Sequence, residues 1–128
     1  MTELPYRLNP LKNTQSIPIN WKFSQDDYDK ITKGHRSNWC VFLSSDVVHF
    51  CRISGDEFYR FAVSKNNQGI YVGNNLETYV TDDFSLSAKI KGWTKEEFKE
   101  HENNFRKLVL EETSGLLDSC FGIRVGEN

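Results

Sequence analysis

The sequence predicts an α+β protein: an antiparallel β-meander of three to four strands, with a short N-terminal helix and a long C-terminal helix packed on the sheet. Three observations predict this fold class. The middle of the chain is a succession of short runs rich in β-branched and aromatic residues. The connections between these runs have only a few residues, so neighbouring strands must pair antiparallel. A capped helical pattern precedes this region and a longer one follows it.

The strands are expected within residues 39–80. The apolar runs cover residues 39–43, 47–53, 58–64 and 70–72, and Ser, Asp, Asn and Gly between them favour turns. Apolar side chains occupy both alternating positions of each run, so neither face of the sheet is plainly polar. We therefore expect the second face to be covered as well, by the N-terminal segment, by another chain, or partly by both.

Residues 1–20 contain all three prolines of the chain, Pro5, Pro10 and Pro18, among scattered apolar residues. Proline breaks a helix, and it restricts the residue before it to extended conformations. This composition predicts an extended N-terminal arm, and its apolar residues indicate that the arm docks on the rest of the domain.

The first helix is predicted over residues 25–33. Ser24 suits the N-cap, and Asp27 three residues later completes an acidic variant of the capping box. Gly34 follows as the C-terminal cap. The expected inward residues are Tyr28 and Ile31.

Between the meander and the last helix the pattern is weak. Gly73, Asn74 and Asn75 are expected to end the last strand. Residues 76–92 then leave three alternatives open: a loop, an edge strand or a helical turn.

The second helix begins after Thr94, which forms a capping box with Glu97. Gly115 either weakens this helix by about 1 kcal/mol relative to alanine or ends it. Residues 122–128 are small and polar, and we expect them to fray. The expected inward residues are Phe98, Phe105, Leu108, Val109, Glu112, Leu116, Leu117 and Cys120.

The length, net charge and cysteine content limit the class of protein. A chain of 128 residues fits a single domain, 1–128. Its formal charge of -2 gives no electrostatic reason to expect a nucleic acid or a membrane as partner. No apolar run is long enough to span a bilayer, and the first residues lack the pattern of a signal peptide, so we expect a cytoplasmic protein. Three scattered cysteines predict reduced, buried thiols.

Motifs for catalysis and metal binding are absent. The sequence has no phosphate-binding glycine loop and no nucleophile elbow. His49 and Cys51 share a strand face and, with Cys120 or His35, are the best candidates for metal ligands or for Cys–His catalysis. A packed pair of core residues is the simpler interpretation. The sequence thus predicts no catalytic residue, no metal site and no cofactor.

Two alternatives stay open. Arg52, His49 and Cys51 could serve a small enzyme or ligand-binding domain with a cleft between sheet and arm. Arg52 and Arg60 could also belong to an RNA-binding sheet, on whose aromatic rings bases stack. The sequence carries no RNP-like motif in support of RNA binding.

Part of the chain resembles a group of small uncharacterised bacterial proteins. The residues WKFS at 21–24 match their W-x-F-S helix start, and Trp39 leads a strand as theirs does. The residues RISG at 52–55 stand where that group has an R-S-W-T-G turn, shortened here and without the tryptophan. The resemblance covers about half of the chain, and its motifs are structural.

More broadly, a small, acidic, aromatic-rich chain of this class is similar to immunity proteins of bacterial toxin systems, which bind and neutralise a toxin domain, often a nuclease. The resemblance implies a non-enzymatic protein-binding module whose partner has a basic surface. The competing interpretation is an ordinary polar connection with two packed tyrosines. The candidate partner-binding residues, expected to cluster at the end of the meander, are Tyr71, Glu77, Tyr79, Asp82 and Asp83.

Overall fold

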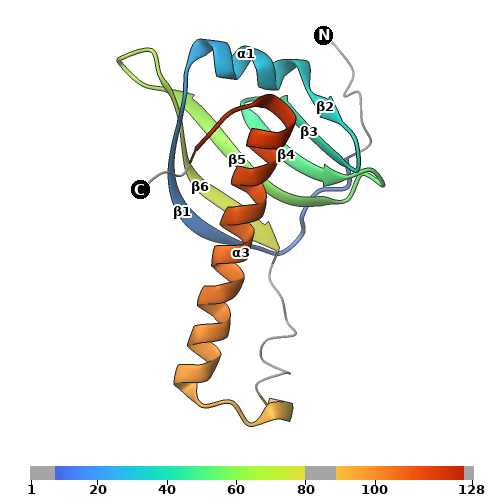
Figure 1. Ribbon diagram of the computed structural model, residues 1–128, viewed down its shortest axis with the longest axis vertical. Helices are drawn as coiled ribbons and strands as arrows, with labels where there is room; N and C mark the ends of the chain where they lie inside the picture. The colour runs from blue at the N-terminus through green and yellow to red at the C-terminus, as the bar shows by residue number, and fades with distance from the viewer. Residues whose placement is uncertain (1–7, 80–88, 126–128) are drawn as a thin grey trace.

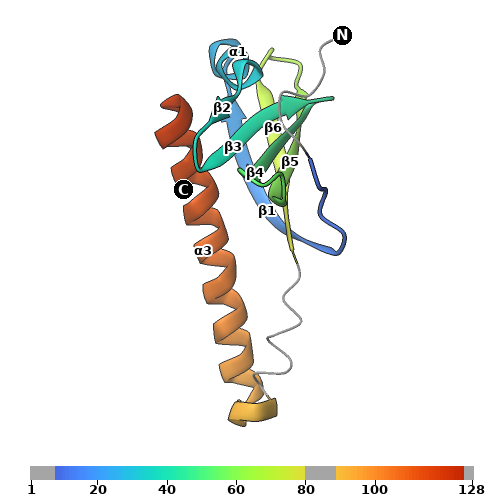
Figure 2. The ribbon, with the colours of Figure 1, turned by 90° about the vertical axis from the view of Figure 1, so that its right-hand side faces the viewer.

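The computed structural model describes residues 8–79 and 89–125. It confirms the α+β class, the antiparallel sheet and the long C-terminal helix, which lies across one face of the sheet (Figures 1 and 2). The strand order is β1-β6-β5-β4-β3-β2, so β2 to β6 form a meander and β1 pairs with its last strand. The elements are β1 (Thr14–Phe23), α1 (Gln25–Lys33), β2 (His35–Arg36), β3 (Trp39–Ser44), β4 (Val47–Arg52), β5 (Glu57–Lys65), β6 (Tyr71–Tyr79) and α3 (Lys95–Phe121).

The sheet has six strands in the described part of the chain, so the prediction of three to four was too low. One missed strand, β2, has two residues, which is too short for any alternating pattern. The other, β1, takes up much of the segment expected to be an arm. Its Pro18 is tolerated because β1 is an edge strand, and the pairing with β6 is irregular between Pro18 and Trp21.

β6 runs to Tyr79 and does not end at Gly73, Asn74 and Asn75 as predicted. These residues lie where the register between β5 and β6 shifts, which is a β-bulge inside the sheet. Gly73 packs directly against Phe61, since a Cβ at this position would lie 2.8 Å from its Cδ2. The glycine therefore marks a close approach between strands, and the turn-forming residues belong to the bulge.

α1 occupies the residues predicted for it, but it is not the first element of the chain, because β1 precedes it. Its capping box is formed: Ser24 Oγ accepts from the Asp27 N–H at 3.1 Å, and Asp27 Oδ2 accepts from the Ser24 N–H at 3.2 Å. Ile31 is buried and Tyr28 is half-buried, so both predicted inward residues pack toward the body.

α3 starts at the predicted cap, Thr94, and continues through Gly115, which lies on an open helix face. Gly122 ends it in the left-handed conformation, with its N–H donating to the Asp118 carbonyl at 2.7 Å. Ile123 then folds back into the core with 3% of its surface exposed. The predicted fraying of residues 122–128 is therefore wrong at Ile123, and residues 126–128 lie outside the described ranges.

The core lies between the sheet and α3. Phe50, Phe61 and Leu76 are fully covered on this side, and Val109, Thr113 and Leu117 are the buried residues of α3. All three belong to the second half of the helix. The first half extends beyond the sheet (Figures 1 and 2), and Leu108, predicted to point inward, is 63% exposed.

The second face of the sheet carries a smaller apolar cluster of Cys40, Phe42 and Cys51, against which Leu8 packs. The next residue, Asn9, exchanges backbone hydrogen bonds with the β4–β5 turn, at 2.8 Å to Gly55 and 3.0 Å from Glu57. The N-terminal segment thus covers part of this face, which is one of the covers expected from the sequence. Neither helix α1 nor α3 is both long and apolar enough to cross a membrane, and no other described helix is.

Candidate functional site

The five predicted partner-binding residues do not form one cluster among the described residues. Tyr71 and Tyr79 stand at the two ends of β6, a nine-residue strand that spans about 26 Å at about 3.3 Å per residue. Tyr71 stacks on Tyr28 with ring centroids 4.0 Å apart, and its hydroxyl donates to Gln25 Oε1 at 3.3 Å. Tyr71 therefore joins α1 to the sheet.

Glu77 lies on the opposite face from α3, where its Oε2 accepts from Arg60 Nε at 2.6 Å. Asp82 and Asp83 fall in residues 80–88, outside the described ranges. Of the three predicted residues that the structure describes, Tyr79 is the one that lines a groove at the end of the sheet.

An aromatic cluster forms where one end of the sheet meets α3. Tyr59 stacks on Trp39 with centroids 5.9 Å apart, and Tyr79 meets Phe58 and Phe105 edge-to-face at 5.7 and 5.5 Å. In the β4–β5 pairing, Tyr59 stands opposite Phe50 and Glu57 stands opposite Cys51, so Phe58 is the extra residue of a β-bulge. This bulge lets two consecutive side chains join one cluster.

A groove of about 540 Å³ opens beside this cluster, and we call it the aromatic groove. Its buried part is formed by Tyr59 and Val109, while Tyr79 and Phe105 are half-buried. Exposed residues of α3 border it. The residues lining the aromatic groove are Tyr59, Tyr79, Phe105, Leu108, Val109, Glu111 and Glu112.

Glu111 and Glu112 give the aromatic groove its negative charge. The Tyr59 hydroxyl donates to Glu112 Oε1, and burial together with this bond raises the pKa of Tyr59. Burial and the charge of Glu112 also raise the pKa of Tyr79. Both phenols therefore keep their protons at neutral pH, and the groove combines neutral rings with carboxylates.

The aromatic cluster already holds one cation of this chain. The Arg52 guanidinium carbon lies 4.8 Å from the centre of the Trp39 ring. Its charge acts on Tyr59 in the direction opposite to that of Glu112. Arg52 thus belongs to the α3 side of the sheet, at the far end of the cluster from Phe105.

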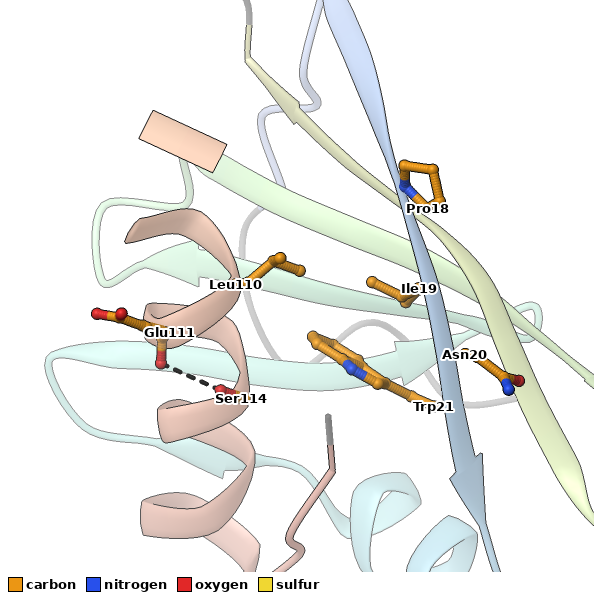
Figure 3. A pocket seen from close by; sticks show the side chains of 7 residues that line it. All are labelled: Pro18, Ile19, Asn20, Trp21, Leu110, Glu111 and Ser114. Atoms are coloured by element: carbon orange, nitrogen blue, oxygen red, sulfur yellow. Dashed lines mark hydrogen bonds between the residues drawn. The ribbon is translucent and has the colours of Figure 1, made fainter. Parts of the chain in front are cut away.

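A second, smaller cleft of about 190 Å³ lies between β1 and α3 (Figure 3). Trp21 and Ile19 point from β1 toward Leu110 of α3, and Trp21 is only 3% exposed. On the helix, Ser114 Oγ donates to the Glu111 carbonyl at 3.3 Å. This cleft is a narrow space between two elements, and it has about a third of the volume of the aromatic groove.

A buried polar chain crosses the other face of the sheet. Glu57 contacts His49 Nδ1, and its Oε1 accepts from Arg60 Nη1 at 3.1 Å and from the Leu11 N–H at 3.0 Å. Burial alone would raise the pKa of Glu57, but the bonds from His49 and Leu11 and the charge of Arg60 outweigh it and lower that pKa. These hydrogen bonds and ion pairs tie the N-terminal segment to β4 and β5.

The structure does not bring Arg52 together with His49 and Cys51. Arg52 stands on Trp39, whereas Cys51 pairs across the strands with Cys40 on the other face. Cys51 is completely covered, and burial followed by the charge of Glu57 raises the pKa of its thiol to about 12. Residues 8–79 and 89–125 contain no group of three or more His, Cys, Asp or Glu side chains arranged for a metal.

Together these features describe an α+β protein whose antiparallel sheet and long helix enclose an acidic, aromatic groove. No protein-family model, no curated protein and no solved structure matches the chain.

Phe105, Leu108 and Glu112 were identified in the sequence only as inward helix residues. Helical spacing could not show that α3 extends beyond the sheet at this point, which is what leaves them around a groove.

Proposed function

We propose that this chain is a non-enzymatic protein-binding module, most concretely an immunity or antitoxin-like protein that binds and neutralises a bacterial toxin domain. The observation that carries the proposal is the aromatic groove. It presents half-buried rings and the exposed Leu108 beside the carboxylates of Glu111 and Glu112. Aromatic anchors bordered by polar groups are typical of protein interfaces.

The long helix supplies the area that such an interface needs. A stable interface buries roughly 800 Å² on each partner, far more than a single groove offers. The first half of α3 extends past the sheet (Figure 2) and contributes none of the buried residues of the described helix. The aromatic groove is lined by residues of α3 from Phe105 to Glu112. The proposed interface therefore combines the aromatic groove with the extended half of α3.

The charge favours a basic partner. Glu111 and Glu112 border the groove, and the whole chain has a formal charge of -2. Toxins that act on nucleic acids carry basic surfaces for the phosphate backbone, and an acidic inhibitor is complementary to such a surface. The proposed setting is therefore the bacterial cytoplasm, with a toxin domain as the partner.

The proposal is tested by affinity purification of the full chain from its native cells, with bound proteins identified by mass spectrometry. Supporting evidence is a stoichiometric partner that stops growth when expressed alone and is neutralised by co-expression of this chain. Leu108→Glu should fail to neutralise it. Ala62→Glu, the same kind of change at an exposed strand residue, is the control and should neutralise fully. A captured protein without toxicity would contradict the proposal.

A further inference from the structure

We propose that the aromatic groove receives one lysine or arginine side chain of the partner. The inference rests on the proposed function and specifies the chemistry of its contact. It follows from three properties of the groove: a carboxylate with bonding capacity left, aromatic rings that are partly open, and an apolar border.

The carboxylate is that of Glu112. Its Oε1 accepts from the Tyr59 hydroxyl, which fixes the direction of the carboxylate. Across residues 8–79 and 89–125, no hydrogen bond or ion pair is formed by Oε2. A carboxylate accepts up to about four hydrogen bonds, so it can take a bond from an ammonium or guanidinium group without releasing Tyr59.

The rings are those of Tyr79 and Phe105. They meet edge-to-face at 5.5 Å, and both remain half-buried, so part of each ring borders the groove. A cation over an aromatic face is attracted by the ring quadrupole. The same cluster shows this contact within the chain, where Arg52 lies 4.8 Å from the centre of the Trp39 ring.

The apolar border is Leu108, whose side chain is 63% exposed. Lysine and arginine carry a flexible apolar stem below the charge, which can lie along such a residue while the head group reaches a carboxylate. A volume of about 540 Å³ admits such a side chain. An acidic side chain would be repelled, and a neutral one would cover Glu112 without pairing it.

The test uses the full-length protein and two small probes of nearly equal shape. Nα-acetyl-arginine amide carries the guanidinium charge, and Nα-acetyl-citrulline amide lacks it. The ring resonances of Tyr79 and Phe105 are followed by NMR during titration. We expect saturable shifts with the arginine probe at millimolar concentration, and at least about tenfold weaker binding of the citrulline probe.

Two variants in the groove and one control test whether the preference for arginine arises there. Glu112→Gln should abolish the preference for arginine over citrulline. Glu100→Gln changes an exposed carboxylate on the same helix and should preserve it. Tyr79→Leu keeps the site apolar, and it should weaken arginine binding because the ring face is lost. Equal shifts with both probes, or no shift with arginine, would overturn the inference.

Two further outcomes separate this inference from the proposed function. A toxin that is neutralised although arginine shows no preference would overturn the inference alone. Arginine preference without any toxin among the captured proteins would overturn the proposed function alone. Sedimentation velocity during the titration tests whether a second copy of this chain occupies the groove. If the arginine probe dissociates a dimer into monomers, a second copy fills the groove and the assignment to a different partner is wrong.

Discussion

At the scale of single residues, Glu57 links several parts of the chain on the second face of the sheet. Its carboxylate is completely covered, and it meets His49, Arg60 and the Leu11 N–H. A buried charge is tolerated only when its partners compensate the lost hydration. The partners of Glu57 come from β4, β5 and the N-terminal segment, so one side chain holds three parts of the chain.

Glu57→Gln should therefore destabilise the fold strongly. The change removes the charge and leaves Arg60 with Glu77 as its remaining described ion-pair partner. We expect the free energy of unfolding to fall by about 3 kcal/mol at neutral pH, as when a buried pair loses one member. Urea denaturation measures this free energy. The control is Glu100→Gln on the exposed side of α3, which should change the free energy of unfolding little. A loss no greater than that of the control would contradict this role.

The penalty of Glu57→Gln should also depend on pH. The pKa of Glu57 is lower in the folded protein, while an unfolded Glu titrates near about 4.3. The unfolded chain thus binds more protons in this window, so the stabilisation is complete above about pH 4.3 and is lost as pH falls through the folded pKa. The difference between wild type and variant should shrink in acid. A difference that grows in acid would contradict the assignment.

Tyr59→Phe isolates the bond that orients Glu112. The ring stays, and the buried hydroxyl that donates to the carboxylate is lost. We expect a loss of about 1–2 kcal/mol, since hydrogen bonds to charged groups exceed neutral ones. Tyr71→Phe is the matched control, because its hydroxyl bonds to Gln25 at the surface. Thermal unfolding of both variants measures the two losses of stability. Equal losses would contradict a larger contribution from the hydrogen bond of Tyr59 to Glu112.

At the scale of elements, two glycines have opposite roles. Gly73→Ala would place a Cβ 2.8 Å from Phe61 within β6, so we expect a loss of about 1–3 kcal/mol, typical of overpacking. Gly115→Ala meets nothing within 4 Å on α3. It should stabilise the protein by up to about 1 kcal/mol, the difference in helix propensity. Urea denaturation of the two variants measures the change in the free energy of unfolding, which should fall for Gly73→Ala and rise for Gly115→Ala.

The elements that the sequence predicted are those with local signals. Capping boxes at Ser24 and Thr94 mark the two helices, and turn residues separate β3, β4 and β5. β1 and the extension of β6 were missed because both are specified by their mutual pairing. Pro18 and Gly73, which locally indicate irregular chain, fit an edge strand and a close packing contact in the folded sheet.

The candidate site was less predictable for the same reason. Tyr79 was identified as a partner-binding residue, but its neighbours Tyr59 and Glu112 are 20 and 33 positions away in the chain. They meet only because α3 crosses the sheet at one end of β5 and β6. No spacing rule in the sequence encodes that crossing.

At the scale of the whole molecule, the two faces of the sheet differ in how they are used. The N-terminal segment covers part of one face through Leu8, Asn9 and Leu11. α3 covers the other with its second half and leaves its first half extended beside the aromatic groove. The groove and the extended helix lie on the same side of the molecule, which supports a single binding surface for one partner.

The most direct test of this account is the affinity of the captured partner for three forms of the chain, measured by titration calorimetry. The account predicts tight binding by wild type and by Ala62→Glu, and at least about thirtyfold weaker binding by Leu108→Glu, as for an interface anchor worth about 2 kcal/mol. Equal affinity of all three forms would show that the partner binds elsewhere, and it would contradict the assignment of the aromatic groove as the interface.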